Sequence, residues 1–202
     1  NLRGNDVACS PVFLSYLACS ASEVLLFVNA SILSGELVKA LEADGVSIRP
    51  YEEFYAFVSS LEGQRVLLNR KKVNAAVLEA LPDSAVLVEG ENPTEWAKSV
   101  KNETEQQMMI EAHRRDGAAL TKWIYWLKEA VKTEPLTEIS AAERLETFRE
   151  AQPDYQGPSF APILSYAEHG AIVHYSASPE TNADLAPHGF LLADTGGHYL
   201  QG

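Results

Sequence analysis

Basic residues and long apolar runs are scarce in this sequence. Its 202 residues hold 16 Lys and Arg against 28 Asp and Glu, a net charge of -12. Nucleic acids are bound largely through Lys and Arg, so this balance argues against a nucleic-acid partner. No apolar run reaches the roughly 18 residues that a membrane-spanning helix needs. We therefore expect neither a nucleic-acid partner nor a membrane span.

Cysteine is also scarce, and several catalytic motifs are missing. Cys9 and Cys19 belong to no CxxC or Cys/His pattern, so we expect two free, buried thiols. The sequence contains no HExxH, GxSxG or glycine-rich phosphate loop. These absences argue against a single-zinc protease helix, an α/β-hydrolase and a P-loop nucleotide site.

What the sequence does contain is a hydrophobic fraction of 46%, enough for a substantial core. Up to about residue 90, β-rich and helical patterns alternate, which predicts an α/β fold. A polar, proline-containing stretch at 91–94 then marks a boundary between two periodic regions. The strands are expected at 12–19, 23–28, 46–48, 65–69 and 85–88, and the helices at 34–43, 52–61 and 73–81.

Two helices are predicted after the boundary. Asn102 and Glu105 form a capping-box pattern, and apolar residues then recur every three or four positions from 108 to 131, as one buried stripe. The charged run 113–116 on this helix is interpreted as a solvated face with local ion pairs. Ser140 and Glu143 form a second capping-box pattern.

The last third of the sequence holds the candidate chemistry. His174 lies in a β-rich run, Ala171 to Tyr175, and Asp194 ends the apolar run 190–193, just before Thr195-Gly196-Gly197. A carboxylate at the end of a buried strand and before glycines can be directed into a cleft as a metal ligand or general base. An Asp in this position can equally be a turn former, and a His can serve local structure.

Three segments carry a family resemblance: 168–175 (EHGAIVHY), 179–182 (PETN) and 194–202 (DTGGHYLQG). Their order and spacing resemble the Xaa-Pro aminopeptidases, metallopeptidases of the pita-bread fold. The resemblance implies an α/β (α+β) chain with a middle, creatinase-N-terminal-like α/β domain at 1–92. The first part of a pita-bread catalytic domain would follow at 93–202.

The same resemblance implies a function. The protein would use a metal-bridged water to release the N-terminal residue from peptides with proline second. Asp194 would be one ligand of two divalent metal ions, manganese with zinc or cobalt as alternatives. His174 would contact the substrate carbonyl, whereas His169 and His198 are interpreted as non-ligands. His188 is expected to be exposed in a Pro-His-Gly turn. Family members also suggest a cytoplasmic location and a homodimer.

Two other functions stay open at this point, a non-catalytic pita-bread binding or scaffold module and a related proline dipeptidase. The sequence starts at Asn1, which corresponds to a mid-chain segment of the family, and ends at Gly202, before the family's second metal-binding Asp. We therefore expect a fragment that is inactive alone and binds no metal tightly. The family's later ligands would separate the enzyme from the binding module.

Overall fold

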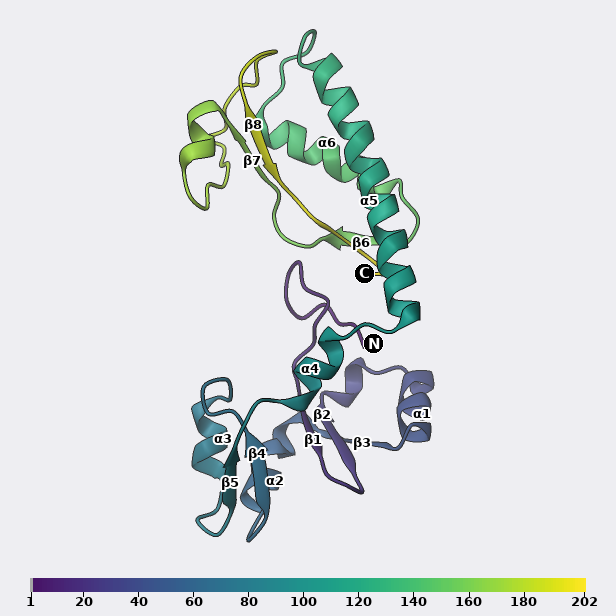
Figure 1. Ribbon diagram of the computed structural model, residues 1–202, viewed down its shortest axis with the longest axis vertical. Helices are drawn as coiled ribbons and strands as arrows, with labels where there is room; N and C mark the ends of the chain where they lie inside the picture. The colour runs from purple at the N-terminus through teal and green to yellow at the C-terminus, as the bar shows by residue number, and fades with distance from the viewer. Residues whose placement is uncertain (1) are drawn as a thin grey trace. The chain divides into compact units, whose positions relative to one another are not determined.

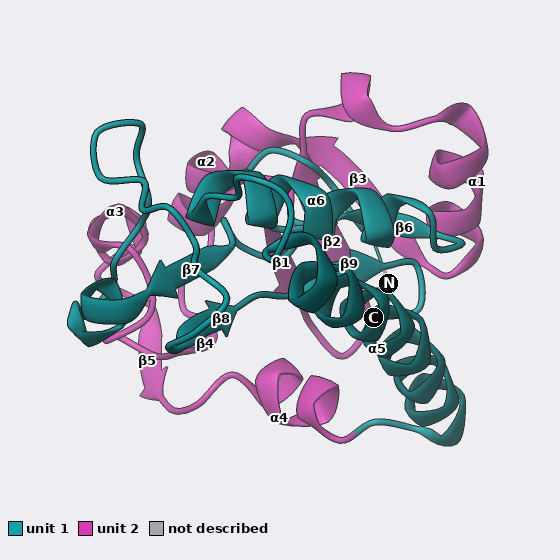
Figure 2. Ribbon diagram, turned by 90° about the horizontal axis from the view of Figure 1, so that it is seen from above, with its two compact units in different colours: residues 1–12, 101–202 teal, residues 13–100 magenta. Residues whose placement is uncertain are grey.

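The computed structural model describes residues 2–202, which divide into two compact units (Figure 2). One unit comprises residues 13–100. The other combines residues 2–12 with residues 101–202. The domain boundary at residue 93 stays a prediction, and each unit is described by itself.

The unit 13–100 has the predicted alternation of strands and helices, and its strands form two sheets. In the first sheet, β2 lies between antiparallel β1 and parallel β3; in the second, β4 and β5 are parallel. The strands are β1 Ser15–Cys19, β2 Val24–Val28, β3 Val46–Pro50, β4 Arg65–Leu68 and β5 Val86–Glu89. The helices are η1 Ala30–Ile32, α1 Gly35–Ala43, η2 Tyr51–Glu53, α2 Phe54–Ser59, α3 Ala75–Ala80 and α4 Pro93–Ser99.

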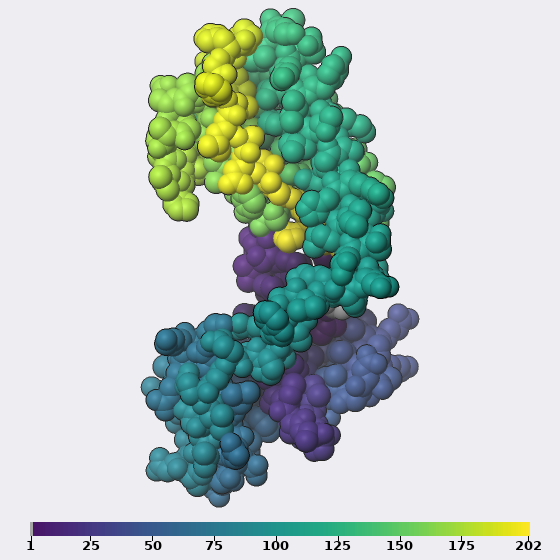
Figure 3. All heavy atoms as spheres, viewed as in Figure 1, coloured from purple at the N-terminus to yellow at the C-terminus, as the bar shows by residue number. Residues whose placement is uncertain are grey.

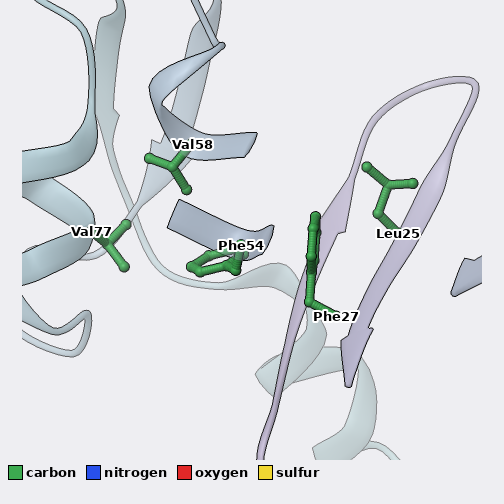
Figure 4. Packing of buried hydrophobic residues seen from close by; sticks show 5 residues of the cluster. All are labelled: Leu25, Phe27, Phe54, Val58 and Val77. Atoms are coloured by element: carbon green, nitrogen blue, oxygen red, sulfur yellow. The ribbon is translucent and has the colours of Figure 1, made fainter. Parts of the chain in front are cut away.

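The core of this unit joins β2 to helices α2 and α3. Leu25 and Phe27 from β2 pack in one buried cluster with Phe54, Val58 and Val77 (Figure 4). The rings of Phe27 and Phe54 meet edge to face, with centroids 5.2 Å apart. Phe54 is therefore a core residue of this unit.

The second unit is built on the two predicted helices, α5 Glu103–Ala130 and α6 Glu138–Glu150. The capping box of α5, Asn102 with Glu105, is confirmed. The predicted capping box of α6 is wrong, because Thr137 is the N-cap and Ser140 is its N3 partner. The Thr137 hydroxyl accepts from the Ser140 amide at 3.1 Å, so the helix starts three residues before the predicted position.

Trp123 on α5 is central to the core of this unit. It packs with Ala141, Leu145 and Leu164, and its indole nitrogen donates to the Ala141 carbonyl at 2.8 Å. The predicted stripe is narrower than expected at its N-terminal end, where Met108 and Met109 are exposed. The buried residues of α5 are instead Ala112, Ala119, Trp123 and Ala130.

Four short strands form one interrupted antiparallel ribbon in this unit. The chain segment with β6 Tyr155–Pro158 and β7 Ile163–Tyr166 runs opposite the segment with β8 Leu191–Asp194 and β9 Gly197–Tyr199 (Figure 1). The break is bridged by one hydrogen bond, from the Ser159 amide to the Gly196 carbonyl at 3.0 Å. Asp194 is the last residue of β8, so it lies at this break.

The strand predicted over Ala171–Tyr175 is wrong. Residues 167–171 form a short helix, η3 Ala167–Ala171, and the chain then turns, with the Tyr175 amide donating to the Ile172 carbonyl at 3.2 Å. The side chains of His169 and Tyr175 are both held by a buried carboxylate, Glu138, so the segment cannot extend. The strand preference of the β-branched residues Ile172 and Val173 is therefore outweighed by these tertiary contacts.

The two thiols are free, as predicted, but neither is buried, since Cys9 is half-buried and Cys19 is exposed. No helix among residues 2–202 is long and apolar enough to span a membrane.

Candidate functional site

Asp194 is held by a strand pair but points to solvent. It pairs with Ile163 of β7 and is exposed, as are Leu192 and Ala193 before it. The prediction of a strand that ends at Asp194 is confirmed, whereas the prediction of a buried strand is wrong. In Figure 3 the yellow C-terminal segment is uncovered on the surface of its unit. The Asp194 carboxylate is therefore open to a ligand.

The two glycines after Asp194 are required by close packing. A Cβ atom at Gly196 would overlap the Ser159 hydroxyl. A Cβ atom at Gly197 would lie 2.9 Å from Asp116 Oδ1 and 3.0 Å from the Tyr155 ring. Both distances are below ordinary van der Waals contact, so only glycine fits without a shift of its neighbours. The space beside these two glycines is therefore taken by protein atoms and is not open to a ligand.

A buried ion pair holds the segment that follows Asp194. Arg149 is 0% exposed, and it donates to Asp116 through Nε at 2.8 Å and Nη2 at 3.2 Å. Nη2 also lies 3.0 Å from the Thr195 hydroxyl oxygen, and the Tyr199 hydroxyl donates to Asp116 Oδ1 at 3.1 Å. The pair thus joins α5, α6 and both sides of the Gly196-Gly197 step.

The electrostatics of this network follow from its burial. Burial, and then the charge of Asp116, raises the pKa of the Tyr199 hydroxyl far above its ordinary value. Arg149 Nη1 is buried without a hydrogen-bond partner among the described residues. A buried donor without a partner is costly, so the other contacts of Arg149 must outweigh that cost.

The charged run on α5 is therefore only partly the solvated face that the sequence suggested. His113 and Arg114 are exposed. Arg115 and Asp116 instead make ion pairs with residues distant in sequence, Arg115 with Asp154 at 2.6 Å and Asp116 with Arg149. A helical charge pattern does not reveal such partners.

His174 lies in the turn after η3, with an exposed side chain. Its φ angle of 57° is in the left-handed region, which is uncommon for any residue other than glycine. Such backbone strain clusters at functional sites and persists only where neighbouring contacts enforce it. Tyr175, the next residue, is buried and supplies such a contact.

Glu138 is the functional candidate that the sequence did not reveal. Its side chain is 0% exposed and accepts hydrogen bonds from the amides of Tyr166 and Ala183 at 2.6 and 3.1 Å. The Tyr175 hydroxyl lies 2.7 Å from Oε2, and His169 Nδ1 lies 2.9 Å from Oε1. Burial alone would raise the pKa of Glu138, but these hydrogen bonds outweigh it and lower the pKa below its ordinary value. No local pattern in the sequence pointed to it, because its partners lie 28 to 45 positions further along the chain.

Asp194 is the one predicted metal ligand in the described chain. Residues 2–202 bring together no group of three or more His, Cys, Asp or Glu side chains that could hold a metal ion. His169 instead contacts Glu138, and His198 Nε2 lies 3.2 Å from the Cys9 carbonyl oxygen. The described residues alone therefore do not fit a complete metal site, and Asp194 could only contribute to a larger set of ligands.

A hollow of about 300 Å³ lies in the unit 13–100, which contains none of these residues. Its lining includes Leu25 and Phe27 of β2, together with Arg49 and Glu53. The first two are core residues, so the hollow is the edge of a packed interior.

The fold and these residues define the class of protein, an α/β unit together with a pita-bread segment in which the strand β8 ends at Asp194. Residues 1–105 match the creatinase/prolidase N-terminal domain, and residues 107–202 match the metallopeptidase family M24. The chain belongs to this creatinase/prolidase and M24 family.

Several relatives of the chain are named as Xaa-Pro aminopeptidases. The chain is 36% identical to a probable Xaa-Pro aminopeptidase P of Botryotinia fuckeliana and to Xaa-Pro aminopeptidase 1 of Dictyostelium discoideum, with all of this chain and 32% of each relative covered. It therefore spans about a third of the length of these relatives.

Solved structures of proteins with related names are similar to this chain. A crystal structure of X-prolyl aminopeptidase from Caenorhabditis elegans, described as a cytosolic enzyme with a di-nuclear active site, superposes with a TM-score of 0.88 at 29% identity. It covers 98% of this chain and 33% of that one. A Xaa-Pro dipeptidase from Bacillus anthracis shares the fold, with a TM-score of 0.68 at 15% identity.

Proposed function

We propose that the protein containing this chain is a metal-dependent aminopeptidase that releases the N-terminal residue from peptides with proline in second position. The observation that carries the proposal is Asp194, an exposed carboxylate at the end of β8. The next residue, Thr195, accepts a hydrogen bond from the buried Arg149. The relatives named above support the substrate class.

Asp194 and His174 have different roles in this proposal. Asp194 would be one ligand of a pair of divalent metal ions, which when bound activate water and polarise the substrate carbonyl. His174, exposed and held in a fixed turn, would donate a hydrogen bond to the substrate carbonyl oxygen as negative charge develops there. Manganese is the proposed metal, the cytoplasm the proposed location and a homodimer the proposed assembly.

The test is peptide hydrolysis by the full-length protein. We expect a peptide with proline second to lose its N-terminal residue, and the matched peptide with alanine second to be cleaved far more slowly. A chelator should abolish cleavage, and added manganese should restore it more fully than zinc or cobalt. Equal cleavage of both peptides, or cleavage that resists the chelator, would contradict the proposal.

The same assay separates a related activity. A proline dipeptidase cleaves Xaa-Pro dipeptides but not longer peptides, whereas the proposed aminopeptidase cleaves tripeptides and longer chains. Peptide binding without cleavage, in metal-loaded protein, would favour a non-catalytic binding module instead. The B. anthracis dipeptidase shares the fold at only 15% identity, so it does not favour the dipeptidase over the aminopeptidase.

A further inference from the structure

We propose that Glu138 is a positioning residue that holds His174 in its binding conformation through Tyr175 and His169. The inference deepens the proposed function, because it assumes that His174 contacts the substrate. It concerns contacts within residues 138–183 and does not depend on a bound metal.

The turn that carries His174 is anchored at both ends by one carboxylate. His169 near its start lies 2.9 Å from Glu138 Oε1, and Tyr175 at its end lies 2.7 Å from Oε2. The two rings stack on each other with centroids 4.4 Å apart and planes 28° from parallel. The five residues between these anchors therefore have little freedom.

The strained backbone of His174 points to the same cause. A φ angle of 57° at a non-glycine residue costs free energy, so it needs contacts that enforce it. His174 itself is exposed, and its flanking residue Val173 is 83% exposed. The only deeply buried residue adjacent to His174 is Tyr175, so the anchoring of Tyr175 sets the turn.

The anchor requires a carboxylate rather than any polar group. The amides of Tyr166 and Ala183 and the hydroxyl of Tyr175 all donate to Glu138, and His169 contributes a fourth contact. A glutamine would present one acceptor oxygen and an amide nitrogen that only donates. At least one buried donor would then face another donor, which is costly.

A substitution at Tyr175 tests the same contact with a smaller change to the buried site. Its hydroxyl lies 2.7 Å from Glu138 Oε2 and 3.0 Å from the Thr181 carbonyl oxygen. The shorter contact involves a charged acceptor, which makes it the stronger of the two. Tyr175→Phe removes this hydroxyl and keeps the buried ring.

The experiment compares Glu138→Gln and Tyr175→Phe in the full-length protein. The first readout is the imidazole NMR signal of His174, assigned by its loss in His174→Gln. The second is the separate measurement of kcat and KM on a peptide with proline second. The control is Glu146→Gln, which removes a carboxylate of the same helix that accepts from Tyr155 at 2.7 Å.

We expect both test variants to shift or split the His174 signal, and Glu146→Gln to leave it unchanged. A misplaced His174 should lower kcat by about 10- to 100-fold. KM should stay within about twofold, because the contact strengthens only in the transition state. If Glu138→Gln does not fold, Tyr175→Phe still gives both readouts.

An unchanged His174 signal in Tyr175→Phe, with kcat unchanged, would overturn the positioning role and leave Glu138 as a structural carboxylate. A wild-type protein that does not cleave the peptide would overturn the proposed function instead. In that case the NMR signal alone still decides whether Glu138 positions His174.

Discussion

Arg149 and Asp116 form a two-point ion pair, with Arg149 Nε 2.8 Å from one carboxylate oxygen and Nη2 3.2 Å from the other. The pair joins helices α5 and α6, and Nη2 also lies 3.0 Å from the Thr195 hydroxyl oxygen. Thr195 directly follows Asp194, so the buried guanidinium fixes the backbone next to the candidate ligand. The exposed Asp194 carboxylate thus lies next to a residue that is fixed by buried hydrogen bonds, as a metal ligand requires.

Removal of the Arg149 guanidinium should destabilise the protein. Arg149→Met leaves Asp116 without its charge partner, and loss of one partner of a buried ion pair costs about 3 to 5 kcal/mol. Because the Asp116 side chain is 25% exposed, the lower end of that range is expected. Chemical denaturation measures the free energy of unfolding.

The control for this variant is Arg114→Met on α5. Arg114 is 76% exposed and lies 3.9 Å from Glu111, so its loss should change stability by no more than about 0.5 kcal/mol. Equal losses in the two variants would show that the buried pair adds nothing specific.

Two glycine-to-alanine variants should have opposite effects. At Gly197 a Cβ atom would lie 2.9 Å from Asp116 Oδ1, and Asp116 is fixed by Arg149. Gly197→Ala should therefore destabilise the protein by about 1 to 3 kcal/mol. Gly117 is inside α5 with no atom near its Cβ position, so Gly117→Ala should stabilise by about 0.5 to 1 kcal/mol. Thermal unfolding measures the change in stability of both variants. An unchanged stability in Gly197→Ala would mean that the antiparallel ribbon can move away from α5.

Acid should weaken the fold partly through Glu138. Hydrogen bonds lower its pKa in the folded protein below the ordinary value of 4.5, despite burial. A carboxyl with a lowered folded pKa stabilises the protein above that ordinary value, and this contribution is lost as pH falls through the folded pKa. The free energy of unfolding of the wild type should therefore fall more steeply below pH 4.5 than that of Glu138→Gln.

Urea titrations at pH 7 and at about pH 3 would measure this difference, with Glu143→Gln as the control. Glu143 lies on the same helix and is exposed, so its substitution should keep the wild-type dependence. Parallel pH curves for the wild type and Glu138→Gln would contradict the account.

The sequence predicted helices and strands where local patterns dominate. The periodicity and the Asn102–Glu105 capping box gave α5, and the apolar run before Asp194 gave β8. The pattern failed over residues 171–175, where β-branched residues suggested a strand. There the structure depends on Glu138, more than 30 positions away, and no local pattern contains that contact.

The buried charges were missed for the same reason. Asp116 has the sequence context of a solvated helix face, and Arg149 that of an ordinary residue in a last helical turn. Only the pairing of α5 with α6 brings them together, and tertiary pairing is not encoded in helical spacing. The glycines after Asp194 were noted, but their reason lies in Ser159 and Asp116 rather than in a ligand.

The most direct test of the account is the metal content of the full-length protein with Asp194 replaced. We predict that Asp194→Asn lowers bound metal, measured by mass spectrometry after dialysis, from about two ions per chain toward one or none, as expected for loss of a ligand. Cleavage of peptides with proline second should fall with it. The control Asp184→Asn changes an exposed carboxylate of the same unit and should keep both the metal and the activity. Undiminished metal and activity in Asp194→Asn would contradict the assignment of Asp194 as a ligand, and with it the central claim.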